Sequence, residues 1–489
     1  MKTKKNAIPY LIAVIAITTV IFSICSTTSP LYTFCDESHC FFNVGKAIFN
    51  GRVLYKDILE QKGLIIYLIQ IPAYLISHTT FIGVWAIQII LLLLFSVAAY
   101  ELNICLGLDN FQSMIAVAIS DLIIFTSQSL ASGQIVEVYA LPLFMYSLYS
   151  LTRNLEESRD FSWQMVLLNG IFAGIILWMK YSLLGFYFAW AAFVCIYLFI
   201  KKGFGKALKT GLVFLGGMLI VTIPCLLYFF LNGAITDLID CYFTNNISGY
   251  GNQITLGGLV FNYIHTLYSE LRWNLPVMVF LGIGVCAVLF SRMKVASKLS
   301  LIIIALFNAV VVFSHGPMFP YYLFAFAPFV VFGGYGITKV IGLLLKKQTS
   351  RKLTAVLFSL VACVLAYVYK PCPREFLADT SGLSQYVFAE YMNSKHESPT
   401  MLNYDFLDGG FYTVADIVPN TWAYCGLNWD NPLMDQDQLE TISNKKVDFV
   451  VTNRNDNLPK ELFENYVLVD QISQYRVNTL FTYYLYEAR

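Results

Sequence analysis

Long apolar runs separated by short polar segments dominate the first 370 residues of the chain. A helix needs about 20 apolar residues to cross the hydrocarbon core of a bilayer. Runs of this kind predict eleven membrane-spanning helices, at about residues 8–25, 81–105, 111–131, 135–151, 163–179, 182–200, 210–231, 274–290, 299–314, 320–345 and 353–370. The first run follows Lys2, Lys4 and Lys5, and the sequence CSTTSP after it is a poor cleavage site. We therefore interpret it as a retained anchor and not as a signal peptide.

A further apolar stretch, LIIYLIQIPAYLIS at 64–77, is ambiguous. Its 14 residues would reach only about 21 Å as a helix, and Pro72 lies near its middle. Basic residues gather in three polar loops, KKGFGKALK (201–209), SRMKVASK (291–298) and KKQTSRK (346–352). The positive-inside rule puts these loops in the cytoplasm with the N-terminus, which requires that 64–77 does not cross. We expect an interfacial or re-entrant helix there.

This topology predicts three extracytoplasmic segments, at residues 26–80, 232–273 and 371–489. In the last of them acidic residues outnumber basic ones, and no apolar run is long enough to span a bilayer. It contains short β-rich runs between Asn, Asp, Gly and Pro, namely KVDFVVTN (446–453), NYVLVDQI (465–472) and TLFTYYLYE (479–487). The sequence thus predicts a mostly α, polytopic membrane domain over 1–370 and a small extracytoplasmic α/β domain over 371–489.

Composition supports a protein of the cell membrane. Only 13% of the 489 residues are charged and the mean hydropathy is +0.62, whereas a soluble domain carries about 25% charged residues. The net charge of +1 and the lack of a basic patch argue against a nucleic-acid partner. The 11 cysteines show no metal-ligand spacing, and the nearest pair, Cys35 and Cys40, is compatible with a local disulfide or with two free thiols. We expect no cofactor, although the sequence leaves a divalent metal ion open.

The first extracytoplasmic loop carries most of the polar chemistry near the N-terminus. It begins with the acidic pair Asp36 and Glu37, continues through apolar residues at helical spacing over 42–49, and ends near Lys62. A carboxylate can act as a general base, and a lysine can neutralise a phosphate. Ordinary charges at the level of the lipid headgroups would give the same pattern, so spacing alone does not decide between these readings.

The same loop resembles the GT-C superfamily of membrane glycosyltransferases, in the branch of the protein O-mannosyltransferases and the lipid A aminoarabinose transferase. CDES supplies an acidic pair, NVGKAIFNGRVLYKD (43–57) is similar to a "G…l..G.vpYrD" element, and EQKGLIIYL (60–68) matches a lysine stretch, although Gln61 and Leu64 replace the frequent His and Pro. SGQIVEVYALP (132–142) resembles a "GG.tE.…P" element. The resemblance implies an inverting glycosyltransferase with a polyprenyl-phosphate-linked sugar donor. Its acceptor would be an envelope glycan, a glycolipid or a protein.

The resemblance, together with polar residues that lie toward the same predicted outer face, gives a set of candidate site residues. Asp36 would be the catalytic base, and the substrate would be bound by Glu37, Arg52, Tyr55, Asp57, Lys62, Glu137, Lys180, Tyr321 and Tyr322. Asp36, Lys62, Glu137 and Lys180 are expected to line one outward-facing cavity that opens sideways to lipid.

Several of these positions also have ordinary explanations. A helix dipole favours Glu137 at a helix start, and Lys180 could extend its charge to the headgroups. Tyr321 and Tyr322 could belong to an aromatic belt. A lipid or polysaccharide transporter, or a non-catalytic assembly protein, is the competing function. A transporter would need charges deep within several spans, and here they cluster at the predicted outer edge.

Overall fold

The computed structural model divides the chain into two compact units. The first, here called the helical unit, comprises Met1–Ser26, Ile87–Pro224 and Gln253–Pro373, and the second, the mixed unit, comprises Thr27–Ala86, Cys225–Asn252 and Arg374–Arg489. The structure describes residues 7–31, 37–133, 135–246, 256–313, 319–344, 351–369, 379–428, 431–476 and 479–489.

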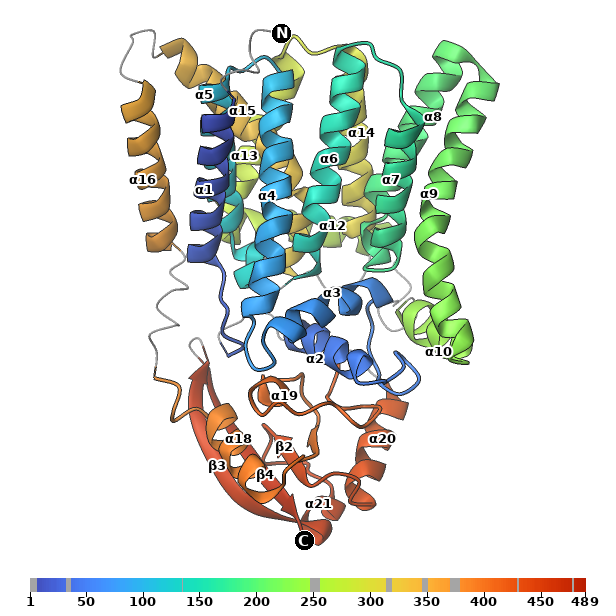
Figure 1. Cartoon of the computed structure of the whole chain (residues 1–489), viewed down its shortest axis with the longest axis vertical. Helices are drawn as coiled ribbons and strands as arrows, with labels where there is room; N and C mark the ends of the chain where they lie inside the picture. Colours follow the sequence, from blue (N-terminus) through green and yellow to red (C-terminus); the bar gives the residue numbers. More distant parts are fainter. Residues whose placement is uncertain are drawn as a thin grey trace. The chain divides into compact units, whose positions relative to one another are not determined.

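Helices occupy all eleven ranges that the apolar runs predict, and in Figure 1 they stand side by side as a bundle. They are α1 (Ile8–Cys25), α4 (Ile82–Cys105), α5 (Asn110–Phe125), α6 (Val136–Glu156), α7 (Trp163–Leu177), α8 (Gly185–Lys202), α9 (Phe204–Leu231), α13 (Leu275–Phe290), α14 (Val295–Val312), α15 (Ala327–Leu344) and α16 (Arg351–Tyr369). Within the described residues, six helices are long and apolar enough to cross a bilayer, or seven if α12 (Leu256–Trp273) and α13, bent by 110°, form one span. The fold is therefore that of a polytopic α-helical membrane protein, and the count of eleven spans stays a prediction.

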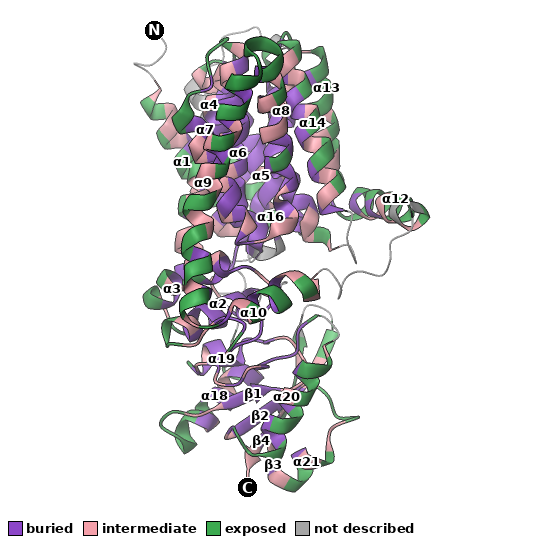
Figure 2. Cartoon of the chain, turned by 90° about the vertical axis from the view of Figure 1, so that its right-hand side faces the viewer, coloured by how far each residue is buried: buried purple, intermediate pink, exposed green. Residues whose placement is uncertain are grey.

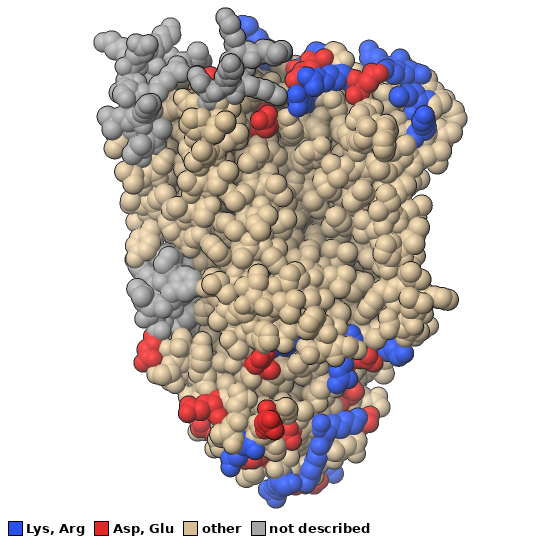
Figure 3. Space-filling view, in the orientation of Figure 1, with Lys and Arg blue, Asp and Glu red and all other residues tan. Residues whose placement is uncertain are grey.

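Contacts between the helix connections place two of the basic loops at one end of the bundle. Lys294, before α14, donates from Nζ to Ser158 Oγ after α6 at 2.6 Å. Lys202, at the end of α8, forms an ion pair with Asp160 before α7. Figure 3 shows Lys and Arg at this end and a wide band without charged side chains along the helices. Residues 346–350 of the third basic loop lie outside the described residues.

Which end of the bundle faces the cytoplasm is predicted from the loop charges alone. Reporter fusions at residues 78–80 and after Lys370 are expected to report the extracytoplasmic side. Alkaline phosphatase, which is active only outside the cytoplasm, and a fluorescent protein that matures in the cytoplasm would serve as paired reporters. A cytoplasmic signal at either position would refute the eleven-span topology.

Small and hydroxyl side chains allow the helices of this unit to pack closely. A Cβ atom at Gly170 in α7 would lie 2.0 Å from the carbonyl oxygen of Phe214 in α9, so only glycine fits there. Much of α5 is coloured as buried in Figure 2, and the Asp121 carboxylate of this helix is fully buried. It accepts hydrogen bonds from Thr18 of α1 at 2.6 Å and from Ser96 of α4 at 3.1 Å. These hydroxyls satisfy a polar group that would otherwise be costly in an apolar interior.

In the mixed unit, α2 (Glu37–Phe49) packs closely against α3 (Leu64–Ile76). A Cβ atom at Gly45 would lie 2.8 Å from the Tyr67 carbonyl oxygen, so glycine is required at this crossing. The 13 residues of α3 would reach about 20 Å, short of the roughly 30 Å hydrocarbon core. Short helical turns, α10 (Ile235–Leu238) and a π-helical segment at Ile239–Thr244, also belong to this unit.

The C-terminal part of the mixed unit contains the predicted α/β fold. Its four strands, β1 (Met401–Asn403), β2 (Phe449–Thr452), β3 (Tyr466–Arg476) and β4 (Thr479–Ala488), form one sheet in the order β1-β2-β4-β3. β1 and β2 are parallel, and the other two pairs are antiparallel. The helices of this part are α18 (Ser384–Lys395), α19 (Phe411–Val414), α20 (Pro432–Ser443) and α21 (Lys460–Asn465). The three β-rich runs of the sequence correspond to β2, β3 and β4.

Buried polar contacts join α2 to this C-terminal part. Lys46 is fully buried, and its Nζ donates to Asp416 Oδ1 at 3.1 Å and to the Tyr412 carbonyl at 3.2 Å. One turn earlier, Asn43 Nδ2 donates to Asp408 Oδ2 at 2.5 Å. Buried ionic groups are stable only when they are paired, so these contacts fix α2 in one position. The predicted first loop and the predicted C-terminal domain therefore fold together.

Asp408 should make the stability of the mixed unit depend on pH. Burial raises the pKa of this carboxyl from 3.8 to about 6. Because the folded chain then binds the proton more tightly than the unfolded chain, the contribution of Asp408 to stability increases as pH falls from about 6 to about 4. The full effect is about 3 kcal/mol, and it is lost again as pH rises through 6.

The matched control for this prediction is Asp408→Asn, which has the same shape and no titration. The melting temperature of the purified protein, measured between pH 7 and pH 4.5, should rise relative to that of the variant as pH falls. Parallel curves for the two proteins would show that Asp408 does not titrate in this range.

Candidate functional site

One group of predicted site residues lies at the two ends of the first loop, in the mixed unit. Glu37 is the first residue of α2, where a carboxylate is favoured by the helix dipole. Its Oε2 lies 3.7 Å from Lys62 Nζ, just before α3, and the two side chains are only 17% and 15% exposed. The loop therefore brings together an acidic and a basic group that are 25 residues apart in sequence. Asp36 lies outside the described residues, so its role stays a prediction.

A tight turn before Lys62 contains three further predicted residues. Tyr55 adopts a left-handed backbone with φ of 68°, its hydroxyl donates to the Lys62 carbonyl, and its ring stacks on Phe229. Asp57 closes the turn by accepting the backbone N–H of residue 53 at 2.8 Å. Arg52 is half-buried at the start of the turn. Tyr55 and Asp57 thus support the loop that holds Lys62, and their contact with a substrate stays a prediction.

Glu60 is a buried carboxylate that was not among the site residues expected from the sequence. It is 4% exposed and accepts a hydrogen bond from the Tyr67 hydroxyl of α3. Burial raises the pKa of Glu60, and the nearby Lys62 ammonium opposes this shift. The Glu60 carboxyl therefore lies close enough to Lys62 to interact with its charge. One feature of the sequence points to Glu60. It lies two residues before Lys62, in a short polar segment that precedes an apolar helix.

A second group of predicted residues lies in the helical unit and comes from three separate segments. Glu137, in the first turn of α6, forms an ion pair with Lys180 between α7 and α8, with 2.6 Å between Oε1 and Nζ. The Glu137 side chain is 1% exposed and that of Lys180 is 11% exposed. The ammonium also lies 5.1 Å from the ring centre of Tyr321 and 4.6 Å from that of Tyr322, in the 3₁₀ helix η5 (Pro320–Phe326). The structure thus brings four predicted residues together.

The second carboxylate oxygen of Glu137 is a notable feature of this group. Oε2 is buried and has no hydrogen-bond partner among the residues that the structure describes. An unpaired buried carboxylate oxygen is costly and is expected to accept a hydrogen bond from a bound molecule or water. Gln88 of α4 positions the segment before α6 by donating to the Gly133 carbonyl, where φ is +90°. Nothing in the sequence indicated a role for Gln88, because it lies within a long apolar run.

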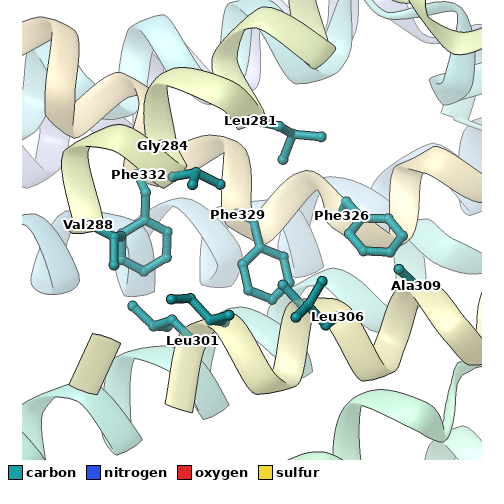
Figure 4. A pocket seen from close by; sticks show the side chains of 12 residues that line it. Leu281, Gly284, Val288, Leu301, Leu306, Ala309, Phe326, Phe329 and Phe332 are labelled. Atoms are coloured by element: carbon teal, nitrogen blue, oxygen red, sulfur yellow. The ribbon is translucent and has the colours of Figure 1, made fainter. Parts of the chain in front are cut away.

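The described residues show an apolar pocket but no metal centre. No group of three or more His, Cys, Asp or Glu side chains in the described ranges could hold a metal ion. A pocket of about 250 Å³ lies among α13, α14 and α15 in the helical unit. Its lining is entirely apolar (Figure 4) and includes Leu281, Leu301, Phe326, Phe329 and Phe332. Such a pocket can hold hydrocarbon and offers no group that would bind a phosphate or a sugar.

The comparisons with known proteins identify the fold. No protein-family model matches the chain, and no curated protein sequence matches it. Two solved structures of ArnT from Cupriavidus metallidurans match 98% of this chain and 98% of their own, at 12% sequence identity. The structure bound to undecaprenyl phosphate gives a TM-score of 0.58, and the apo structure gives 0.56. Over 98% of its length, the chain therefore has the same fold as ArnT from Cupriavidus metallidurans.

Proposed function

We propose that this protein is a glycosyltransferase that transfers a sugar from a polyprenyl-phosphate-linked donor to an acceptor outside the cytoplasm. The observation that carries the proposal is the full-length likeness to ArnT, which was solved bound to undecaprenyl phosphate. The acceptor would be an envelope glycan, a glycolipid or a protein. The N-terminus would face the cytoplasm, and the site and the C-terminal domain would lie outside the cell membrane.

Two partly buried lysines support a donor that carries one phosphate group. Lys62 and Lys180 are 15% and 11% exposed, and each lies beside a glutamate. An ammonium group has three N–H donors, so Lys180 can bind Glu137 and a phosphate oxygen together. A charge held in a partly desolvated site stabilises a developing phosphate more strongly than one in water. In this proposal the lysines stabilise the polyprenyl phosphate as it leaves.

The remaining groups fit an inverting displacement. Asp36 would accept the proton of the acceptor hydroxyl, and the hydroxyl oxygen would attack the anomeric carbon as the bond to the phosphate oxygen breaks. One displacement from the opposite face inverts the configuration at that carbon. General-base catalysis provides about 10²–10⁴-fold, and positioning and charge stabilisation must supply the rest. Glu137 Oε2, unpaired among the described residues, would accept a hydrogen bond from a sugar hydroxyl.

Removal of Lys62 tests the donor site directly. Lys62→Ala is expected to weaken the binding of undecaprenyl phosphate about 10-fold or more, because a hydrogen bond to a charged group contributes about 1.5–3 kcal/mol. Lys62→Arg should bind better than Lys62→Ala because it keeps the positive charge. Affinity can be measured with the purified protein in detergent by native mass spectrometry.

The matched control is Lys56→Ala, which removes an exposed lysine of the same loop whose Nζ donates to the Asn232 carbonyl at 2.9 Å. This variant should bind undecaprenyl phosphate as the wild type does. Unchanged affinity in Lys62→Ala would mean that Lys62 does not bind the phosphate, and Lys180 would become the leading candidate.

A transporter or a non-catalytic assembly protein makes a different prediction. Either would bind the polyprenyl phosphate without cleaving the bond between the phosphate and the sugar. Release of polyprenyl phosphate from a polyprenyl-phosphate sugar, in the presence of an envelope extract as the acceptor source, distinguishes these classes. Binding without release would favour the non-catalytic alternatives.

A further inference from the structure

Two buried cysteine sulfurs meet inside the mixed unit. Cys40 lies in α2, and Cys425 lies in the segment between β1 and β2, 385 residues later in the chain. Their Sγ atoms are 3.9 Å apart. Both residues are buried, with 0% and 1% exposure. The two sulfurs therefore face each other across the contact between the first loop and the C-terminal part of this unit.

The backbone on both sides of this contact is held in place. Three residues after Cys40, Asn43 is bound to Asp408, as described above. On the other side, the Tyr424 carbonyl accepts from Asn403 N at 3.1 Å, and Gly426 N donates to the carbonyl of residue 406 at 2.8 Å. The sulfurs need to approach by only about 2 Å to reach the length of an S–S bond.

We propose that Cys40 and Cys425 form a disulfide bond that links α2 to the C-terminal domain. Each thiol loses a proton, the two sulfurs form one bond, and the two electrons reduce the disulfide of an external thiol–disulfide oxidant to two thiols. Such oxidants act outside the cytoplasm. The proposal thus rests on the predicted orientation of the loop, and it is independent of the proposed sugar transfer.

The bond would form during folding, before Cys40 and Cys425 become buried in the mixed unit. The hydrogen bond between the two sulfurs, together with burial, raises the pKa of the Cys40 thiol, so the folded thiol is a poor nucleophile. Once formed, the bond would hold the start of α2, four residues after Asp36 and three after Glu37. It would therefore limit the movement of the segment that carries the proposed catalytic base.

Peptide mapping of the wild-type protein tests this proposal. The full-length chain, exported to the membrane of a bacterium with an oxidising periplasm, is purified in detergent, denatured without reductant, alkylated with N-ethylmaleimide and digested. We expect one cross-linked species that contains Cys40 and Cys425 and that separates after reduction. Alkylation of both residues before reduction, or a link between Cys40 and Cys35, would overturn the proposal.

Thermal unfolding gives a second test that does not depend on mapping. With a phosphine reductant present during the scan, the melting temperature of the wild type should fall by about 5 °C or more. Cys40→Ala and Cys425→Ala should melt at the same temperature with and without reductant. Cys241→Ala, which removes another buried cysteine of the same unit, should keep the response of the wild type. A wild type that does not respond would contradict the bond.

Discussion

Asp36→Asn is expected to lower the rate of sugar transfer by about 10²-fold or more while leaving donor binding intact. Asparagine has the shape of aspartate but cannot accept the proton of the acceptor hydroxyl. Because the phosphate is assigned to the lysines, affinity for undecaprenyl phosphate should change little. Transfer would be measured with purified protein and a short-chain polyprenyl-phosphate sugar, beside donor binding in the same detergent.

Glu37→Gln is the matched control for this experiment. The neighbouring carboxylate lies 3.7 Å from Lys62 Nζ, and adjacent side chains on a regular backbone point in different directions. We therefore expect a smaller loss of turnover in Glu37→Gln and a larger loss of acceptor affinity. Near-normal turnover in Asp36→Asn would exclude Asp36 as the base. A larger loss in Glu37→Gln would exchange the two roles.

Lys180→Met is expected to weaken binding of undecaprenyl phosphate by about 10–100-fold and to destabilise the helical unit by about 3–5 kcal/mol. The two effects have different causes. Glu137 is 1% exposed, so removal of its cation leaves a buried charge without compensation. Loss of the ammonium also removes the group that would bind the phosphate. Binding assays and thermal unfolding measure the two effects separately.

The double variant Lys180→Met with Glu137→Gln distinguishes a structural from a binding role for Lys180. It has no buried charge at this position, so stability should return close to that of the wild type. If Lys180 binds the donor phosphate, donor affinity should stay low in the double variant. Recovery of both stability and affinity would show that Lys180 serves only to neutralise Glu137.

The membrane helices could be predicted from the sequence because one physical requirement determines most of their residues. A helix in lipid must be apolar over most of its length, and all eleven predicted ranges are helical in the structure. The amphipathic α12 (Leu256–Trp273) was missed because its mixture of polar and apolar residues is typical of a loop in a sequence scan. α9 begins at Phe204, six residues before the predicted start, because Lys206 and Lys209 can lie in a helix at the headgroup level.

The contacts between the candidate site residues were harder to predict from the sequence. Asp36 and Lys62 were expected to line one cavity, which stays a prediction, and the structure shows that Glu37, the residue after Asp36, contacts Lys62. Glu137 and Lys180 were expected to line one cavity, but the sequence did not indicate that they form an ion pair or that two tyrosines from η5 cover the ammonium. Such long-range contacts depend on helix packing, which the order of polar and apolar residues does not encode. The meeting of Asp36, Lys62, Glu137 and Lys180 in one cavity stays a prediction.

The central claim is that this chain uses a polyprenyl-phosphate sugar to modify an acceptor in the cell envelope. Mass spectrometry of envelope glycans and polyprenyl lipids tests it most directly, in cells that contain the wild-type chain, no chain, or the Asp36→Asn variant. We expect one sugar to be missing from a glycan, and its polyprenyl-phosphate form to accumulate, both without the chain and with the variant. Identical glycans and lipids in all three strains would contradict it.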